Sequence, residues 1–199
     1  MSLVAFRRIQ AGRETTRGTE VNATKRLIGA ISLTNDIQRH SPMDERNSLA
    51  EFRRDVDVSQ IASLRYEASA TYQQILDFLL MGVRGGVTGV LDAGTAYNWT
   101  FTPNLTSANA QNAYTLEYGD DTQVWVSVFT MARGLELAFA MNDVVQLRAD
   151  LFSRFAAKSS FTGAIGNPTV NEIVSNRLSV WIDGTWANLG VTAKNALVL

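Results

Sequence analysis

The sequence contains no cysteine and only one histidine, and these two absences exclude several kinds of chemistry. Without cysteine there is no disulfide framework, no thiolate metal site and no redox-active dithiol. A Ser–His–Asp set or a histidine-based metal site would have to depend on His40, which stands in a polar, charged stretch. Because no nucleophile, base and orienting group come together, the sequence argues against an enzyme and indicates no cofactor and no metal site.

The sequence also lacks a long apolar run and a large net charge. No window approaches the roughly 18 uninterrupted apolar residues of a membrane span, and the N-terminus has no signal-peptide core, so we expect a protein that is soluble when made and is not inserted into a membrane. Lys and Arg number 18 against 19 Asp and Glu, and this balance predicts no basic face that holds nucleic acid. The charge is nevertheless uneven, because the first 26 residues are basic and residues 117–150 are acidic.

What the chain does have is two-residue alternation of apolar and polar side chains, which is typical of half-buried strands. In residues 114–118, for example, Tyr114, Leu116 and Tyr118 alternate with Thr115 and Glu117. The same pattern, or a run of residues that suit a pleated surface, predicts strands within residues 25–33, 63–72, 97–102, 123–133, 135–141, 145–151 and 177–183.

Only one segment has helical spacing. Apolar residues of 75–80, a possible capping box from Thr71 to Gln74 and a terminating Gly82 predict one short helix over about 72–81. Many strands and one helix indicate a mainly β protein, an antiparallel β-sandwich or barrel with one short flanking α-helix and long loops or arms. We expect an N-terminal arm over residues 1–24, a sandwich core over 25–157 with a long charged loop at 35–57, and a C-terminal extension over 158–199.

Several motifs resemble the major tail tube protein of long-tailed, non-contractile bacteriophages. They are not catalytic signatures, and their specificity lies in their order along residues 12 to about 152. In chain order they are Gly12–Thr19, Asp44-Glu45-Arg46, Met81–Val87 after the helix, Phe101-Thr102-Pro103 leading into Leu105–Asn109, and Tyr114–Asp120.

This resemblance implies a structural virion protein of the tail tube, assembled in the host cytoplasm. Such a β-sandwich closes with copies of itself into a hexameric ring, and the rings stack into a hollow channel for delivery of phage DNA into the host. The family also implies tape measure and tail-terminating proteins as partners, and double-stranded DNA that passes without specific binding.

Two sets of candidate residues follow from the charge distribution. A channel that passes DNA benefits from walls that repel phosphate, which makes the acidic middle a candidate for the channel lining: Glu117, Asp120, Asp121, Glu136 and Asp143. Stacked rings use two different surfaces of each subunit, and charged residues of the N-terminal arm and the 35–57 loop are candidates for contacts between subunits: Arg7, Arg8, Arg13, Arg17, Asp44, Glu45, Arg46, Arg53 and Arg54.

Two other classes of protein remain as alternatives. A β-sandwich binding or virion decoration module would use exposed aromatic side chains such as Trp125, Trp181 or Trp186 as a platform, although these residues also suit a core or an interface. An enzyme is the third and disfavoured alternative.

Overall fold

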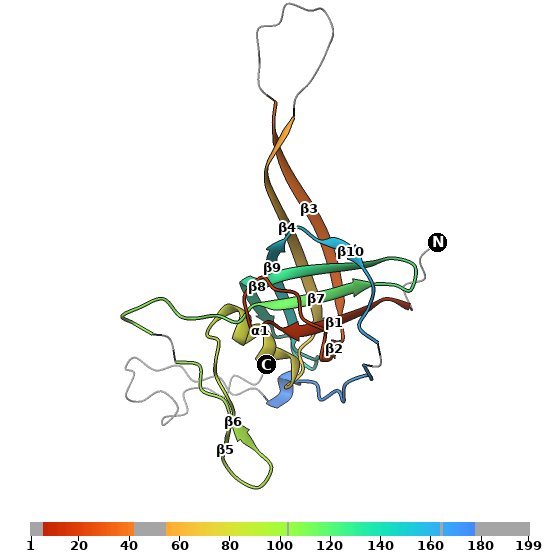
Figure 1. Ribbon diagram of the computed structural model, residues 1–199. Helices are drawn as coiled ribbons and strands as arrows, with labels where there is room; N and C mark the ends of the chain where they lie inside the picture. The colour runs from red at the N-terminus through yellow and green to blue at the C-terminus, as the bar shows by residue number, and fades with distance from the viewer. Residues whose placement is uncertain (1–5, 42–54, 103, 164, 178–199) are drawn as a thin grey trace, which may run out of the picture.

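The computed structural model describes residues 6–41, 55–102, 104–163 and 165–177 (Figure 1). These residues form ten strands, one α-helix and a short 3-10 helix. In chain order they are β1 (Arg8–Arg13), β2 (Lys25–Leu27), β3 (Ala30–His40), β4 (Val56–Ser69), α1 (Gln74–Gly82), β5 (Val90–Leu91), β6 (Tyr97–Asn98), β7 (Tyr114–Gly119), β8 (Val124–Ala138), β9 (Gln146–Arg154), β10 (Ala157–Ser159) and η2 (Ser175–Arg177).

Eight strands form one continuous antiparallel sheet that folds over on itself. Its order is β2-β1-β7-β8-β9-β4-β3, and β10 pairs with β8. The fifteen-residue β8 takes part in both halves, because its first part pairs with β7 and β10 while the part from Met131 onward pairs with β9. We call β2, β1, β7, β10 and the first part of β8 sheet A, and the second part of β8 with β9, β4 and β3 sheet B. The predicted antiparallel β-sandwich with one short helix is confirmed.

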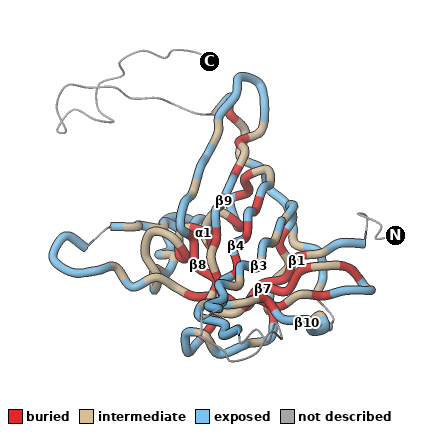
Figure 2. Tube along the Cα trace, turned by 90° about the horizontal axis from the view of Figure 1, so that it is seen from above, coloured by how far each residue is buried: buried red, intermediate tan, exposed pale blue. Residues whose placement is uncertain are grey.

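The core lies between the two sheets and the helix. Alternate residues of β7 in sheet A and of β4 and β9 in sheet B point into it, and α1 adds Phe78 and Met81. Figure 2 shows the buried residues gathered at the centre of the molecule, whereas the projecting loops are exposed. The largest wholly buried side chains are aromatic or aliphatic, as expected where two pleated faces pack together: Tyr66, Tyr114, Phe78, Met81, Leu116 and Leu147.

The helix begins two residues later than predicted, and half of its predicted capping box forms. The Gln74 amide donates to Thr71 Oγ1 at 3.2 Å, but the Gln74 side chain lies 3.5 Å from the Tyr66 hydroxyl instead of reaching back to Thr71. The first turn also carries Asp77, which is 4% exposed and accepts from Lys25 Nζ at 2.5 Å and from the Tyr114 hydroxyl at 3.1 Å. This buried carboxylate therefore ties the helix to both sheet A strands beside it.

Three predicted segments differ from the structure. Residues 1–24 are not simply an extended arm, because Arg8–Arg13 form β1, which is hydrogen-bonded to β2 on one side and β7 on the other. The predicted loop over 35–57 is shorter, since β3 continues to His40 and β4 begins at Val56, and the two form a long hairpin arm. The predicted strand over 97–102 is limited to Tyr97–Asn98, and the one predicted over 177–183 lies almost wholly outside the described residues.

A buried carboxylate fixes the place where β8 bends from sheet A into sheet B. Phe129 has φ 58°, a left-handed conformation that costs a bulky residue free energy. Its amide donates to Glu14 Oε1 at 2.7 Å, and the same carboxylate accepts from the Thr115 hydroxyl at 3.2 Å and from the Gly18 amide at 2.5 Å. Glu14 is 6% exposed, so these bonds form with little competition from water.

We expect Glu14→Ala to lower the free energy of unfolding by about 3 kcal/mol, because three donors lose their acceptor at a largely buried site. Glu14→Gln should cost less, since its carbonyl oxygen can still accept from Phe129 and Thr115. Urea unfolding followed by tryptophan fluorescence measures both variants. Equal stability of Glu14→Ala and the unaltered protein would show that the bend does not depend on this carboxylate.

Buried tyrosines make the fold sensitive to alkali. Burial raises the pKa of Tyr118 to about 12, although its hydrogen bond with Ser127 acts in the opposite direction. The pKa values of Tyr66 and Tyr114 are raised further, mainly by burial and in addition by the negative charge of Asp77. A raised pKa means that the folded state prefers the neutral phenol, so the stability that this preference provides is complete below pH 10 and is lost as the pH rises through the folded-state pKa.

We therefore expect the free energy of unfolding to fall between about pH 10 and pH 12. Tyr118→Phe should make that fall less steep, because the variant has one phenol fewer to ionise. Denaturant unfolding at a series of pH values measures the slope, and Tyr72→Phe, at a tyrosine that is 51% exposed, provides the matched control. An identical slope in Tyr118→Phe and the unaltered protein would contradict the assignment.

Candidate assembly surfaces

Sheet B ends in two strand edges that are open in the described part of the chain. On one side β3 pairs with β4 over eleven residues, and no described strand pairs with its other side. At the opposite end of the sheet, residues 131–138 of β8 pair with β9, while the pairing of β8 with β7 stops at Thr130. Open edges of this length present rows of unpaired amides and carbonyls, which are templates for pairing with another chain.

The outward face of sheet B, which points away from the core, carries a ladder of charges. Glu67 on β4, Arg148 on β9 and Glu136 on β8 lie in one row of direct cross-strand neighbours. Arg148 lies 3.4 Å from Glu136 and 3.9 Å from Glu67, and Arg65 Nε donates to Glu67 at 3.0 Å. Such exposed pairs contribute little stability, but they set a carboxylate beside Arg65 and Arg148.

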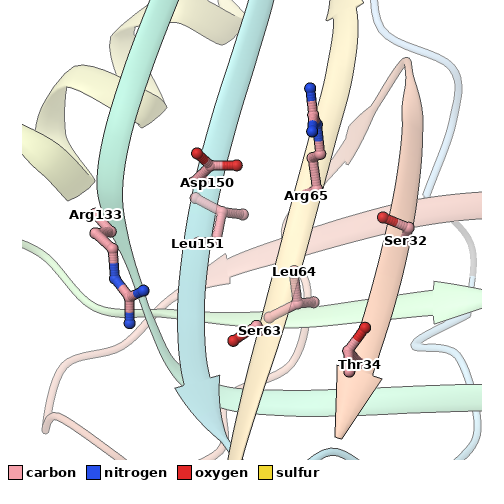
Figure 3. A pocket seen from close by; sticks show the side chains of 8 residues that line it. All are labelled: Ser32, Thr34, Ser63, Leu64, Arg65, Arg133, Asp150 and Leu151. Carbon is pink, nitrogen blue, oxygen red and sulfur yellow. The ribbon is translucent and has the colours of Figure 1, made fainter.

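A shallow polar hollow lies beside this ladder on the same outward face (Figure 3). It is lined by residues of all four strands of sheet B: Ser32, Thr34, Ser63, Leu64, Arg65, Arg133, Asp150 and Leu151. Arg133 lies at the β8 edge of this group, with its side chain directed away from Asp150 (Figure 3). Within the described part of the chain, neither the Arg133 nor the Asp150 side chain has a hydrogen bond or an ion pair.

The outward face of sheet A is covered instead of open. Residues 14–24 and 160–163 lie over it, and polar contacts hold them there. Glu117 on β7 is 3% exposed and accepts from the Thr162 amide at 2.7 Å and its hydroxyl at 2.5 Å, while Thr115 Oγ1 accepts from the Val21 amide at 3.2 Å. Among the described residues, sheet B is therefore the sheet whose outward face is not covered.

The five acids predicted to line a channel do not lie together. Glu117 and Asp120 are buried, the first under Thr162 and the second in the β7–β8 turn, where it accepts from the Thr122 and Gln123 amides at 2.9 Å. Asp121 is exposed in the same turn, Asp143 is exposed in the β8–β9 turn, and Glu136 alone lies on the outward face of sheet B. Two of the five therefore have no accessible carboxylate to present to a channel.

The residues predicted to contact other subunits are also placed differently from one another. Arg8 binds within its own chain, 3.2 Å from Asp121 and 4.1 Å from the centre of the Phe161 ring, and Arg17 donates to the Gln111 carbonyl at 2.7 Å. Arg7 and Arg13 are exposed. The remaining candidates lie outside the described residues: Asp44, Glu45, Arg46, Arg53 and Arg54.

Sequence reasoning missed the charges next to the two open edges of sheet B. Asp36 on β3 lay within a segment predicted to be a loop, and Arg133 on β8 stood at the end of a predicted strand. A signal for Arg133 was present, because a charged residue followed by Gly134 interrupts an apolar run in the way that β-bulges do. The structure places a register shift between Ala132 and Gly134.

Exposed apolar side chains lie at opposite ends of the molecule. The hairpin arm of β3 and β4 projects at one end, and the small β5–β6 hairpin projects at the other (Figure 1). Val56 and Val58 on the arm are 52% and 67% exposed, and Val90 and Tyr97 on the small hairpin are 68% and 62% exposed. A two-stranded hairpin is marginal on its own, and apolar patches of this kind mark contact sites.

The observations that would favour the other classes are weaker. Trp125 is half-buried, with Lys158 Nζ 5.8 Å from its ring centre, and Trp181 and Trp186 lie outside the described residues. No group of three or more His, Asp or Glu in the described residues could hold a metal ion. Nor is any helix among them long and apolar enough to cross a membrane.

Comparison with known proteins gives a structural likeness. No family model matches the chain, and no curated protein matches its sequence. One solved structure that it resembles is the sheath–tube complex of an extracellular contractile injection system (PVC) in the extended state. The match covers 80% of this chain and 92% of that chain at 12% identity, with a TM-score of 0.43.

Proposed function

We propose that this protein is the subunit of a phage tail tube. In this proposal, six copies close side by side into a ring, the rings stack into a hollow tube, and phage DNA passes through the channel into the host. The protein is structural, performs no catalysis, and is incorporated into the virion after assembly in the host cytoplasm. Tape measure and tail-terminating proteins are its proposed partners inside and at the end of the tube.

The observation that carries this proposal is the direction of the two open edges of sheet B. Its four strands alternate in direction, so β3 and the second part of β8 run in opposite directions. When copies are related by rotation about an axis along the strands, the β3 edge of one copy meets the β8 edge of the next in antiparallel orientation. Every ladder in such a ring is antiparallel, and closing the ring leaves no open edge in sheet B.

The number of strands fits a channel. Two copies would give a barrel of about eight strands, which side chains fill, whereas barrels of about sixteen or more strands leave an aqueous channel. Six copies contribute about twenty-four strands, which is wide enough for a duplex to pass. Because residues 14–24 and 160–163 cover the outward face of sheet A, the outward face of sheet B would form the wall of this channel.

The charges on that face suit passage without binding. Glu67, Glu136 and Asp150 balance Arg65, Arg133 and Arg148, and two of the arginines already lie beside carboxylates. An arginine that is paired with a carboxylate has less to gain from a phosphate. We therefore narrow the proposed channel-facing acids to Glu136 together with Glu67 and Asp150, place Asp143 at the rim, and leave out the buried Glu117 and Asp120 and the sheet A residue Asp121.

Stacking of rings would use the two projecting ends. A heterologous contact needs two different and complementary surfaces on each subunit, and the hairpin arm and the β5–β6 hairpin provide exposed apolar side chains at opposite ends. The charged residues between His40 and Asp55 and the exposed Arg7 and Arg13 remain candidates for contacts between rings. Their charges would set the orientation in which the apolar contact between two rings forms.

Negative-stain microscopy of the purified protein tests the proposal directly. We expect rings with a central hole, or tubes made of such rings, because each copy has two complementary edges. Size-exclusion chromatography with light scattering should give a mass about six times that of the chain for single rings. A protein that stays monomeric at high concentration in both measurements would refute the proposal.

Val58→Asp tests the stacking contact separately. The side chain is 67% exposed and lies beyond the core, so the substitution should leave the fold intact while placing a charge in an apolar contact. We expect rings that no longer form tubes, whereas the apolar control Val58→Ile should form tubes. Tubes of normal length from Val58→Asp would show that the arm does not mediate stacking.

A further inference from the structure

We propose that an ion pair between Arg133 of one copy and Asp36 of the next fixes the register in which two copies join. The inference rests on the proposed ring, because it requires the β8 edge of one copy to lie beside the β3 edge of its neighbour. It adds to that ring a specific pair of residues and a specific stagger.

Each open edge carries one unpartnered charge, and the two charges are opposite. Asp36 is the only acid on β3, and Arg133 is the only cation on β8. Within the described residues, neither the Asp36 carboxylate nor the Arg133 guanidinium has a hydrogen bond or an ion pair. The other charged side chains of the two edge strands have partners on neighbouring strands: Arg39 lies 3.0 Å from Asp57, and Glu136 lies 3.4 Å from Arg148.

The two charges also lie on the same face of sheet B. Along β3 the more buried Ile31 and Leu33 alternate with the exposed Ser32, Thr34 and Asp36, so Asp36 belongs to the outward set. Arg133 lines the same outward hollow as Ser32 and Thr34 (Figure 3). A continuous sheet from one copy to the next would therefore present both side chains on one side.

Their levels along the strands differ by about the stagger that a closed barrel requires. Cross-strand pairing aligns Gly134 with Asp150, Asp150 with Arg65 and Arg65 with Ser32, which puts Arg133 near the level of Ser32 in its own copy. Asp36 lies closer to the tip of the arm. A barrel whose strands tilt by about 40° shifts roughly one residue per strand, or about four residues over the four strands of each copy.

The direction of the shift agrees as well. Figure 3 shows the outward side of sheet B, with β3 running downward toward the arm. When the figure is turned upside down, so that the arm points upward, β3 is the left edge of sheet B and β8 is the right edge. The right-handed twist of strands fixes the hand of the tilt in a barrel, and this tilt raises the next copy on the left relative to β3, toward the tip of the arm. Arg133 of that copy then meets β3 about four residues nearer the tip than Ser32, at Asp36.

Cysteine cross-linking tests the register, since the chain has no cysteine of its own. We expect the double variant Asp36→Cys, Arg133→Cys to give a ladder of disulfide-linked species up to the complete ring on a non-reducing gel. The matched control, Ser32→Cys with Arg133→Cys, represents joining without stagger and should give little cross-linking. A ladder from the control and none from the first variant would overturn the proposed pair while leaving the ring intact.

Charge reversal tests the ion pair itself. Arg133→Asp and Asp36→Arg should each lose ring formation in low salt, and the double variant that exchanges the two charges should recover it. Asp150→Arg is the control, because it reverses an unpaired charge on the same face of the central strand β9. Circular dichroism and thermal unfolding check that each monomer is folded.

The outcomes separate this inference from the proposed function. Rings from the unaltered protein together with normal rings from both single reversals, or no recovery in the folded double variant, would refute the Arg133–Asp36 pair and leave the tube proposal standing. No rings from the unaltered protein, with no cross-links from either cysteine pair, would refute both.

Discussion

The bend in β8, held by the Glu14 carboxylate, is the feature on which the rest of the structure depends. Up to Thr130 β8 pairs with β7, and beyond it the strand turns away into sheet B. If β8 continued straight, β7 or its extension could cover residues 131–138, and the second open edge of sheet B would not exist. The hydrogen bond from Phe129 to Glu14 thus stabilises the left-handed backbone conformation of Phe129. This conformation bends β8 and leaves the edge formed by residues 131–138 open.

Much of the fold could be predicted from periodicity because most strands have one buried face. The alternation in β9 and the second half of β4 follows the burial pattern residue by residue. In β7 the alternation assigns the two faces but not the exposure, because Thr115 and Glu117 on the outward face are buried as well. It fails at β1, where Gln10 and Gly12 are as buried as Ile9 and Ala11 because a second layer of chain covers sheet A. It fails in the outer part of β3 for the opposite reason, since that part projects beyond the core and polar residues occupy both faces.

The site was harder to predict because it depends on which strands are neighbours. The sequence shows that Glu67, Glu136 and Arg148 lie on polar faces, but only the order β8-β9-β4 places them in one row. Likewise Glu117 falls on the polar side of β7, as alternation requires, and nothing in the spacing of residues reveals that Thr162 comes to lie over it. Local patterns determine the face of a side chain, whereas topology determines what that face meets.

An open edge is a risk for aggregation unless something restricts its partners. Two copies that paired through their β3 edges about Asp36 would bring two carboxylates together, and two that paired through their β8 edges about Arg133 would bring two guanidinium groups together. The proposed contact between unlike edges satisfies both charges at once. Because both lie on the outward face of sheet B, the same charges that select the correct partner would also neutralise each other in the channel wall, so specificity of assembly and weak attraction for phosphate have one physical origin.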